Sequence, residues 1–383
     1  MSVVAAAGFE AAGVVAGLRS GEGPDLALVV NRGPSAAAAA VFTRNRCIAN
    51  PITWSKQAVR DGVASAIVLY SGGANFYTGV LGFQVVHETA EAVGRALDLS
   101  PGDVLVCSTG LLGEQLDSTR VVGGVMRAAE ALSADGGEDA ARAIMTTDTR
   151  PKQAVRRGDG WTVGGMAKGA GMLAPGLATM LVVLTTDADL EAPELDAALR
   201  AATRVTFDRL DSDGCMSTND QVTLLASGAS GVVPDADEFT ALLTDLCRDL
   251  VLQLQADAEG SAHDVTIEVL HAAIEDEAIE VARAIARSNL FKAAVFGNDP
   301  NWGRVLAAVG TTDAEFDPFA IDVEMNGVRV CRAGQPDQPR ELVDLTDRAV
   351  RVVVDLHAGD ATATLWTNDL THDYVHENSA YSS

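Results

Sequence analysis

The stretch GGMAKGAGMLAPGLATMLVVLTTD, residues Gly164 to Asp187, joins three local patterns around which the rest of the chain is organised. Its first part is rich in glycine and predicts a turn that carries Lys168. A proline-glycine break follows, and from Thr179 onward a run of Thr, Met, Leu and Val predicts a buried strand. The stretch therefore indicates a turn that leads directly into the core of an α/β protein.

The glycine turn resembles two nucleotide-binding motifs, but it fits neither. Gly169-x-Gly171-x-x-Ala174 loosely matches a dinucleotide fingerprint, yet that motif must open a helix, and here a strand follows. A phosphate-binding loop needs Gly-Lys-Ser/Thr, whereas Lys168 precedes its glycine. We therefore expect no nucleotide at this turn.

The reactivity of Thr179 as a nucleophile depends on its position in the chain. A threonine hydroxyl is a poor nucleophile, but an N-terminal threonine carries its own base, an α-amino group with a pKa of about 7.7 to 8.0. Small, flexible residues precede Thr179, and backbone strain there would let its hydroxyl attack the Ala178 carbonyl. The residues alone leave two interpretations open: a self-cleaving nucleophile, or a turn that enters a core strand.

Length and composition predict an ordinary globular protein. At about 150 residues per domain, 383 residues suggest two or three domains. Hydrophobic residues make up 48% and charged residues 21%. With 53 acidic and 28 basic residues the net charge is −25, which argues against nucleic acid or an anionic membrane as a partner.

The cysteines and the N-terminal segment predict a cytoplasmic location. The cysteines are odd in number, widely spaced and without a C-x-x-C pair, which favours a reducing compartment. The N-terminal segment lacks a basic region, and no uncharged run approaches the length of a membrane span, so we expect neither a signal peptide nor a membrane anchor. The cysteines are Cys47, Cys107, Cys215, Cys247 and Cys331.

Hydrophobic periodicity predicts a mixed order of strands and helices. That order favours α/β layers of mixed sheet over a dinucleotide-binding fold or a barrel. A helix capped by Asp235 and Glu238 ends near Gly260, where we place a boundary between a main domain, 1–260, and a smaller α/β domain, 261–383. The predicted strands are 26–30, 66–70, 103–107, 179–185, 221–226, 265–270, 292–296, 320–323, 328–331, 350–354 and 361–366, and the other predicted helices are 84–97, 121–132, 194–205 and 276–288.

Sequence blocks along nearly the whole chain carry a family resemblance. In order they are VCSTGLLGE, AIMTTDTRPK, the opening stretch, FDRLDSDGCMSTND, QADAEG, ARSNLFKAAVFGNDPNWGR and the terminal WTNDLTHDYVHENSAYSS. Together they resemble the ornithine acetyltransferases of arginine biosynthesis, a family of self-cleaving N-terminal-threonine enzymes. The resemblance implies a layered αββα sandwich of mixed sheets, an N-terminal-nucleophile-like architecture, with a smaller C-terminal α/β domain.

Carried over residue by residue, the resemblance also implies a set of site residues. Thr179 is the nucleophile, and cleavage of the Ala178-Thr179 bond gives an alpha chain, 1–178, and a beta chain, 179–383. Thr109 and Gly110 stabilise the oxyanion, although a plain turn after a strand would look the same. The expected substrate contacts are Thr147 (favoured within the run Thr146 to Thr149), Lys168, Thr179, Glu259, Asn378 and Ser383.

The implied reaction is a ping-pong transfer of an acetyl group from N-acetylornithine to glutamate through acetyl-Thr179. Glu259 would pair with the ornithine ammonium, while Lys168 and hydroxyl groups hold the carboxylate; without the resemblance, Glu259 would be a residue at a helix end. Some relatives also accept acetyl-CoA as donor, and the sequence does not separate the two types. Two rivals are a self-cleaving aminopeptidase or amidase and a non-catalytic binding protein with an intact chain.

We expect no metal and no redox cofactor, and a heterotetramer or larger assembly of the paired chains. His372 and His376 are four residues apart, but their tail has turn and strand character, which does not suit a zinc site. The Asp211 to Gly214 segment lacks the remainder of a calcium loop. Tyr70, Phe76, Tyr77 and His263 depart from the family pattern and raise the question of whether they narrow the pocket.

Overall fold

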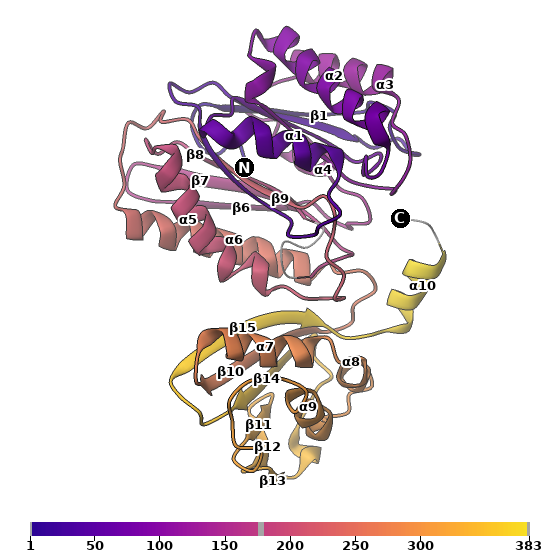
Figure 1. The fold of residues 1–383 in the computed structure, drawn as a ribbon, viewed down its shortest axis with the longest axis vertical. Coiled ribbons are helices and arrows are strands. Elements are labelled where there is room, and N and C mark those ends of the chain that lie inside the picture. The colour runs from indigo at the N-terminus through magenta and orange to yellow at the C-terminus, as the bar shows by residue number, and fades with distance from the viewer. Residues whose placement is uncertain (1, 175–179, 381–383) are drawn as a thin grey trace.

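The computed structural model describes residues 2–174 and 180–380. Residues 1, 175–179 and 381–383 are drawn as a thin trace in Figure 1 and lie outside the described part. The predicted cleavage residues Ala178 and Thr179 and the predicted substrate contact Ser383 therefore lie outside the described residues.

The first sheet has the strand order β1-β2-β4-β5, with antiparallel pairing except between β4 and β5. Its outer face packs against α2 and α3 through a core that includes Leu28, Val68 and Val93. The predicted strands 26–30, 66–70 and 103–107 correspond to β2, β4 and β5. The bounds are β1 Phe9–Val14, β2 Leu26–Asn31, β4 Ala66–Tyr70, β5 Val104–Ser108, α2 Gly79–Leu97 and α3 Ser118–Glu130.

The second sheet has the order β3-β9-β8-β7-β6, so β8 lies at its centre. Helices α5 and α6 cover its outer face, and α6 begins where predicted, because the Asp235 side chain accepts hydrogen bonds from Asp237 N (3.0 Å) and Glu238 N (3.1 Å). The bounds are β3 Ala37–Phe42, β6 Lys152–Arg157, β7 Thr162–Lys168, β8 Leu181–Thr186, β9 Gln221–Ala226, α5 Ala192–Arg204 and α6 Ala236–Gln255.

The two sheets face each other across a shared apolar core. Val29 and Leu69 of the first sheet and Met166, Val183 and Leu225 of the second belong to one buried cluster. With helices outside each sheet, the layers run helix, sheet, sheet, helix (Figure 1). The predicted αββα sandwich of mixed sheets is confirmed.

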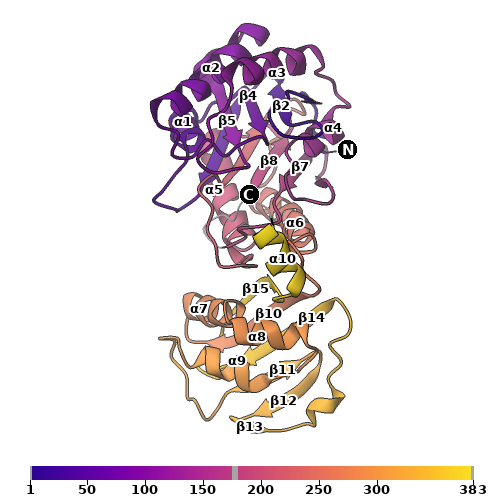
Figure 2. The same cartoon turned by 90° about the vertical axis from the view of Figure 1, so that its right-hand side faces the viewer.

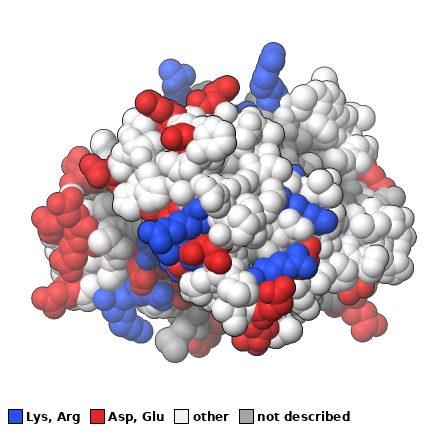
Figure 3. Space-filling model, turned by 90° about the horizontal axis from the view of Figure 1, so that it is seen from below, with Lys and Arg blue, Asp and Glu red and all other residues white. Residues whose placement is uncertain are grey.

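A third, six-stranded sheet follows in the order β13-β12-β11-β14-β10-β15, with its own apolar core under α7, α8 and α9. The end of the molecule seen in Figure 3 carries interspersed acidic and basic side chains. The division of the chain at residue 260 stays a prediction. The bounds are β10 Asp264–Ala272, β11 Asp322–Met325, β12 Val328–Arg332, β13 Gln335–Pro336, β14 Ala349–Asp355, β15 Ala361–Asn368, α7 Glu275–Ala286, α8 Asn289–Phe296 and α9 Trp302–Val309.

The last helix, α10 (His372–Ala380), lies between the third sheet and the first two (Figure 2). Its start is packed so closely that a Cβ on Gly260 would lie 2.2 Å from Tyr374 N. The predicted turn and strand character of this tail is wrong: Thr371 Oγ1 accepts from Tyr374 N (2.9 Å) and starts a helix. The remaining elements are α1 Asn50–Ala58, α4 Gly137–Ala143 and the 3-10 turns η1 Val59–Asp61, η2 Pro101–Asp103, η3 Phe207–Arg209 and η4 Arg340–Leu342.

The first five residues of the opening stretch, 164–168, belong to a strand and not to the predicted turn. Gly164 and Gly165 lie inside β7, and the turn begins only after Lys168. These glycines allow close packing: a Cβ on Gly164 would lie 2.2 Å from Ser2 O, and one on Gly165 would lie 3.1 Å from Leu246 Cδ2. The strand predicted from Thr179 is β8, which is described from Leu181 onward.

The predicted strand 292–296 is also wrong, because this segment belongs to α8. The Ser288 side chain accepts from Phe291 N (3.3 Å) and caps the helix. A short apolar run cannot be assigned to strand or helix by periodicity alone. The end of the family block ARSNLFKAAVFGNDPNWGR lies in the next helix, since α9 begins at Trp302. None of the helices among residues 2–174 and 180–380 is long and apolar enough to span a bilayer.

Candidate active site

Six predicted site residues from separate parts of the chain line one cavity of about 470 Å³. They come from the turn after β5, the loop before β6, the end of β7, the segment after α6 and the helix α10. The residues are Thr109, Gly110, Thr147, Lys168, Glu259 and Asn378. The fold therefore brings together every predicted site residue that the structure describes.

Thr109 and Gly110 form the turn at the end of β5. Thr109 is buried, and its backbone N–H donates to Tyr70 O (3.0 Å), which fixes the turn against β4. Gly110 has a φ of 122°, and a Cβ there would lie 2.9 Å from Gly73 N. Only glycine adopts this backbone without strain, so the sharp turn depends on it.

Lys168 is the last residue of β7, and its side chain is buried. Its ammonium donates to Thr109 Oγ1 (3.2 Å). Burial lowers the pKa of Lys168, whereas the charges of Asp148, Asp220 and Glu259 act in the opposite direction. Strand β7 thus places a buried cation within hydrogen-bond distance of Thr109, a predicted oxyanion residue.

Glu259 is held on both carboxylate oxygens. Thr147 Oγ1 donates to Oε1 (2.8 Å) and Asn378 Nδ2 donates to Oε2 (3.0 Å). The Glu259 backbone N–H donates to Ala170 O (3.0 Å), and a Cβ on Gly171 would lie 2.5 Å from Oε2. The turn after Lys168 is therefore packed against the acid that the family resemblance assigns to the substrate ammonium.

A buried ion network supports this part of the site, and sequence reasoning missed it. Lys152 Nζ lies 2.6 Å from Asp148 Oδ1 and 2.6 Å from Asp257 Oδ2. Asp148 Oδ1 also accepts from Gly169 N (2.7 Å). Burial alone would raise the pKa of Asp148, but the charges of Lys168 and Lys152 and the hydrogen bonds outweigh it and lower the pKa to about 2. The network ties the turn after β7 to the loop that carries Thr147.

Two further polar residues were also missed, Asn219 and Asp220. Asn219 Nδ2 donates to Ala74 O (2.6 Å) and Ser108 O (2.9 Å) beside the Thr109 turn. Asp220 is fully buried, which raises its pKa well above the ordinary range, and its Oδ1 accepts from Met180 N (3.2 Å). The density of polar residues in the block DRLDSDGCMSTND is the sequence signal that could have pointed to them.

The residues that depart from the family pattern are absent from the described lining of this cavity. Tyr70 is buried in the core beneath α2, and Tyr77 is 74% exposed. His263 is buried elsewhere, where Nδ1 pairs with Asp369 Oδ2 (2.7 Å). Phe76 packs edge-on against Tyr77.

The layered fold carries a cavity that gathers hydroxyl, ammonium and carboxylate groups, a set that suits a small polar ligand. Comparison with known proteins gives the class: bifunctional proteins of arginine biosynthesis. The chain belongs to the ArgJ family, whose model matches residues 10–383. The predicted family and enzyme class are confirmed.

The relatives are similar over their full lengths. The "Arginine biosynthesis bifunctional protein ArgJ" of Streptomyces coelicolor is 61% identical over 383 residues, covering 100% of both chains. The protein of the same name from Mycobacterium leprae is 54% identical over 389 residues, covering 100% of this chain and 96% of the relative. A solved structure of ornithine acetyltransferase complexed with ornithine, from Mycobacterium tuberculosis, is 48% identical and covers 47% of this chain and 96% of that chain, with a TM-score of 0.45.

Proposed function

We propose that this enzyme transfers the acetyl group of N-acetylornithine to glutamate by a ping-pong mechanism through acetyl-Thr179. The observation that carries the proposal is the convergence of Thr109, Lys168 and Glu259 on one cavity. These three residues supply a hydroxyl donor, a cation and an anion, which match the oxyanion and the two charged groups of the substrate. No metal or redox cofactor takes part in these steps.

The nucleophile is generated first. The Thr179 hydroxyl attacks the Ala178 carbonyl carbon, and the peptide nitrogen leaves as the new α-amino group, giving an ester. Water then hydrolyses this ester and frees the hydroxyl. The α-amino group serves as the base that removes the hydroxyl proton in the acetyl transfer that follows.

Acylation and deacylation use the same oxyanion site. Thr179 Oγ1 attacks the acetyl carbonyl of N-acetylornithine, and the tetrahedral oxyanion lies against Thr109 and Gly110. Ornithine leaves with a proton from the Thr179 amino group. The amino group of glutamate then attacks acetyl-Thr179 and restores the free hydroxyl. During the first half-reaction, Glu259 pairs with the side-chain ammonium of ornithine, with Thr147 and Asn378 orienting its carboxylate.

Acetyl-CoA is the proposed donor in the second activity, since relatives across the family carry the description bifunctional. Thr179 Oγ1 would attack the thioester carbonyl, the oxyanion would lie against the same residues Thr109 and Gly110, and coenzyme A would leave as its thiol. Glutamate would then accept the acetyl group as before. Acetylation of glutamate by acetyl-CoA in the absence of N-acetylornithine tests this second activity.

The two chains made by cleavage should remain associated. The second sheet supports this, because β7 of the alpha chain pairs with β8 of the beta chain along six residue pairs, from Val163↔Thr186 to Lys168↔Leu181. Separation would expose the buried core on both sides of that sheet. The proposed assembly is a heterotetramer of paired chains or larger.

The experiment that tests the function is turnover of N-acetylornithine with and without glutamate. We expect ornithine release to depend on glutamate, with one N-acetylglutamate formed for each ornithine. Ornithine and acetate released at the same rate without glutamate would contradict the transferase and support the aminopeptidase or amidase alternative.

A further inference from the structure

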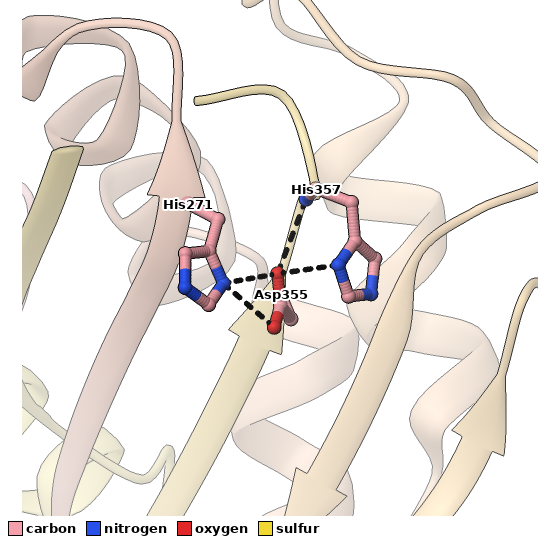
Figure 4. A group of neighbouring side chains, drawn as sticks. All are labelled: His271, Asp355 and His357. Carbon is pink, nitrogen blue, oxygen red and sulfur yellow. Dashed lines mark hydrogen bonds and ion pairs between the residues drawn. The ribbon is translucent and has the colours of Figure 1, made fainter. Parts of the chain in front are cut away.

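Two histidines and an aspartate meet at one edge of the third sheet, away from the residues assigned above. His271 lies near the end of β10, Asp355 ends β14, and His357 follows two residues later (Figure 4). The strands set this arrangement: Leu270 pairs with Asp355 in the parallel register of β10 and β14. Neighbouring strand ends thus bring the three side chains to the same place.

The ligand-type atoms of the three side chains converge. His271 Nδ1 lies 2.8 Å from each Asp355 carboxylate oxygen, and His357 Nδ1 lies 3.2 Å from Oδ1. One ligand atom from each residue lies within 4.8 Å of the other two. Two ligands of a tetrahedral zinc ion, each about 2.1 Å from the metal, are about 3.4 Å apart, so the spacing suits such an ion after small adjustments.

An irregularity in the backbone of β10 places His271 on the exposed side of the strand, where regular alternation would bury it. Val265, Ile267 and Val269 point into the core, so regular alternation would turn His271 inward as well. Instead, the pairing of β10 with β15 shifts register between Val269 and Ala272, and His271 is exposed. A bulge of this kind re-aims a side chain.

A fourth residue, Asp322, lies beside one of the rings. His357 Nε2 lies 3.5 Å from Asp322 Oδ2, while Asp322 Oδ1 accepts from Ala333 N (2.8 Å). A metal-bound histidine usually donates its other ring N–H to a carboxylate, which fixes the tautomer. Asp322 therefore stands where that partner is needed if His357 binds an ion through Nδ1.

We infer that His271, Asp355 and His357 form a binding site for a divalent transition-metal ion, with Zn²⁺ as the best match to two imidazole nitrogens and one carboxylate. Each neutral ring presents its Nδ1 lone pair to the ion and keeps its hydrogen on Nε2, where Asp322 accepts it from His357. The His271 and His357 side chains are 50% and 45% exposed, so the ion enters from solvent and water completes its coordination. Bound metal would link the ends of β10 and β14.

The test is metal binding by the purified full chain after removal of metal with a chelator. Equilibrium dialysis against Zn²⁺, followed by elemental analysis, gives the number of ions bound per chain. We expect His271→Gln and His357→Gln each to bind one ion fewer, whereas His376→Gln, which changes an exposed histidine on α10, binds as the unaltered chain does. Asp322→Asn should weaken Zn²⁺ binding about tenfold. Mg²⁺ prefers all-oxygen sites and should not bind.

Equal Zn²⁺ binding by the unaltered chain and both cluster variants would overturn the inference, and would show that the histidines serve only as surface partners of Asp355. A measurement on the unaltered chain gives an answer even if a variant folds poorly. Crystals soaked in Zn²⁺ should show an anomalous-scattering peak between the two Nδ1 atoms. Absence of that peak at saturating Zn²⁺ would also overturn the inference.

Discussion

Lys168 Nζ lies 3.2 Å from Thr109 Oγ1, and both side chains are buried. An ammonium group can only donate, so the Thr109 oxygen accepts, and its own hydrogen is directed away from Lys168. The pair therefore leaves Thr109 with an O–H group ready to donate to another acceptor in the cavity. A hydroxyl donor of this kind is what the proposed oxyanion site needs.

Loss of the Thr109 hydroxyl should slow the chemical step. Removal of one oxyanion donor lowers kcat by about 10²- to 10³-fold in other enzymes, and we expect Thr109→Val to fall in that range with little change in KM. Thr109→Ser keeps the hydroxyl and is the matched control that should retain most activity. Unchanged kcat in Thr109→Val would contradict the assigned role.

Glu259→Gln should weaken binding of the donor more than binding of the acceptor. The substitution keeps the size of the side chain but removes the charge that is proposed to pair with the ornithine ammonium. Loss of a charged hydrogen bond costs about 1.5 to 3 kcal/mol, which corresponds to about 10- to 150-fold in KM for N-acetylornithine. Steady-state kinetics with each substrate varied in turn measure the effect.

The control for this prediction is Glu377→Gln, which removes a nearby carboxylate on α10 that does not line the active-site cavity among the described residues. It should leave both KM values close to those of the unaltered enzyme. Equal increases in KM for N-acetylornithine and for glutamate in Glu259→Gln would argue against an ammonium site.

Lys152→Met should destabilise the fold, because Asp148 and Asp257 would lose their shared buried cation. Breaking a buried ion pair costs about 3 to 5 kcal/mol. Urea unfolding is best compared in a Thr179→Ala background, where an uncut chain cannot separate into two. Arg200→Met, which removes an exposed ion pair with Asp196, is the control and should cost at most about 1 kcal/mol. Similar losses in both variants would show that the network contributes little.

Asp148 should make the free energy of unfolding depend on pH in the acid range. Its native pKa of about 2 lies below its unfolded value of about 3.9, so its stabilisation is present above about pH 4 and is lost as the pH falls toward 2. The difference corresponds to about 2 to 3 kcal/mol at neutral pH. In the same Thr179→Ala background, the stability gap to Asp148→Asn should shrink as the pH falls from about 5 to 3. A gap independent of pH would contradict the low pKa.

Much of the sandwich could be predicted because its patterns are local. Strands β2 and β4 contain continuous apolar runs, and the Asp235 cap marks the start of α6. The secondary-structure prediction failed where tertiary packing overrides the local sequence pattern. Gly165 occupies a strand because α6 packs closely over it, and the short run 292–296 becomes helical because Ser288 caps it and Phe291 is buried.

The candidate site was predicted mainly through the family resemblance. Neither periodicity nor spacing could have shown that Glu259, after α6, lies beside Asn378 on the last helix. Lys152 was missed because its position in a strand gives no sign of the buried carboxylates on either side. Burial of polar groups in the block that contains Asn219 also arises only when the sheets face each other.

Intact-mass analysis of the purified protein tests the central claim most directly. We expect two polypeptides, one that ends at Ala178 and one of 205 residues (383 − 178) that begins at Thr179. The Thr179→Ala variant should give one uncut, inactive chain. A single full-length mass for an active, unaltered enzyme would contradict the N-terminal-threonine mechanism.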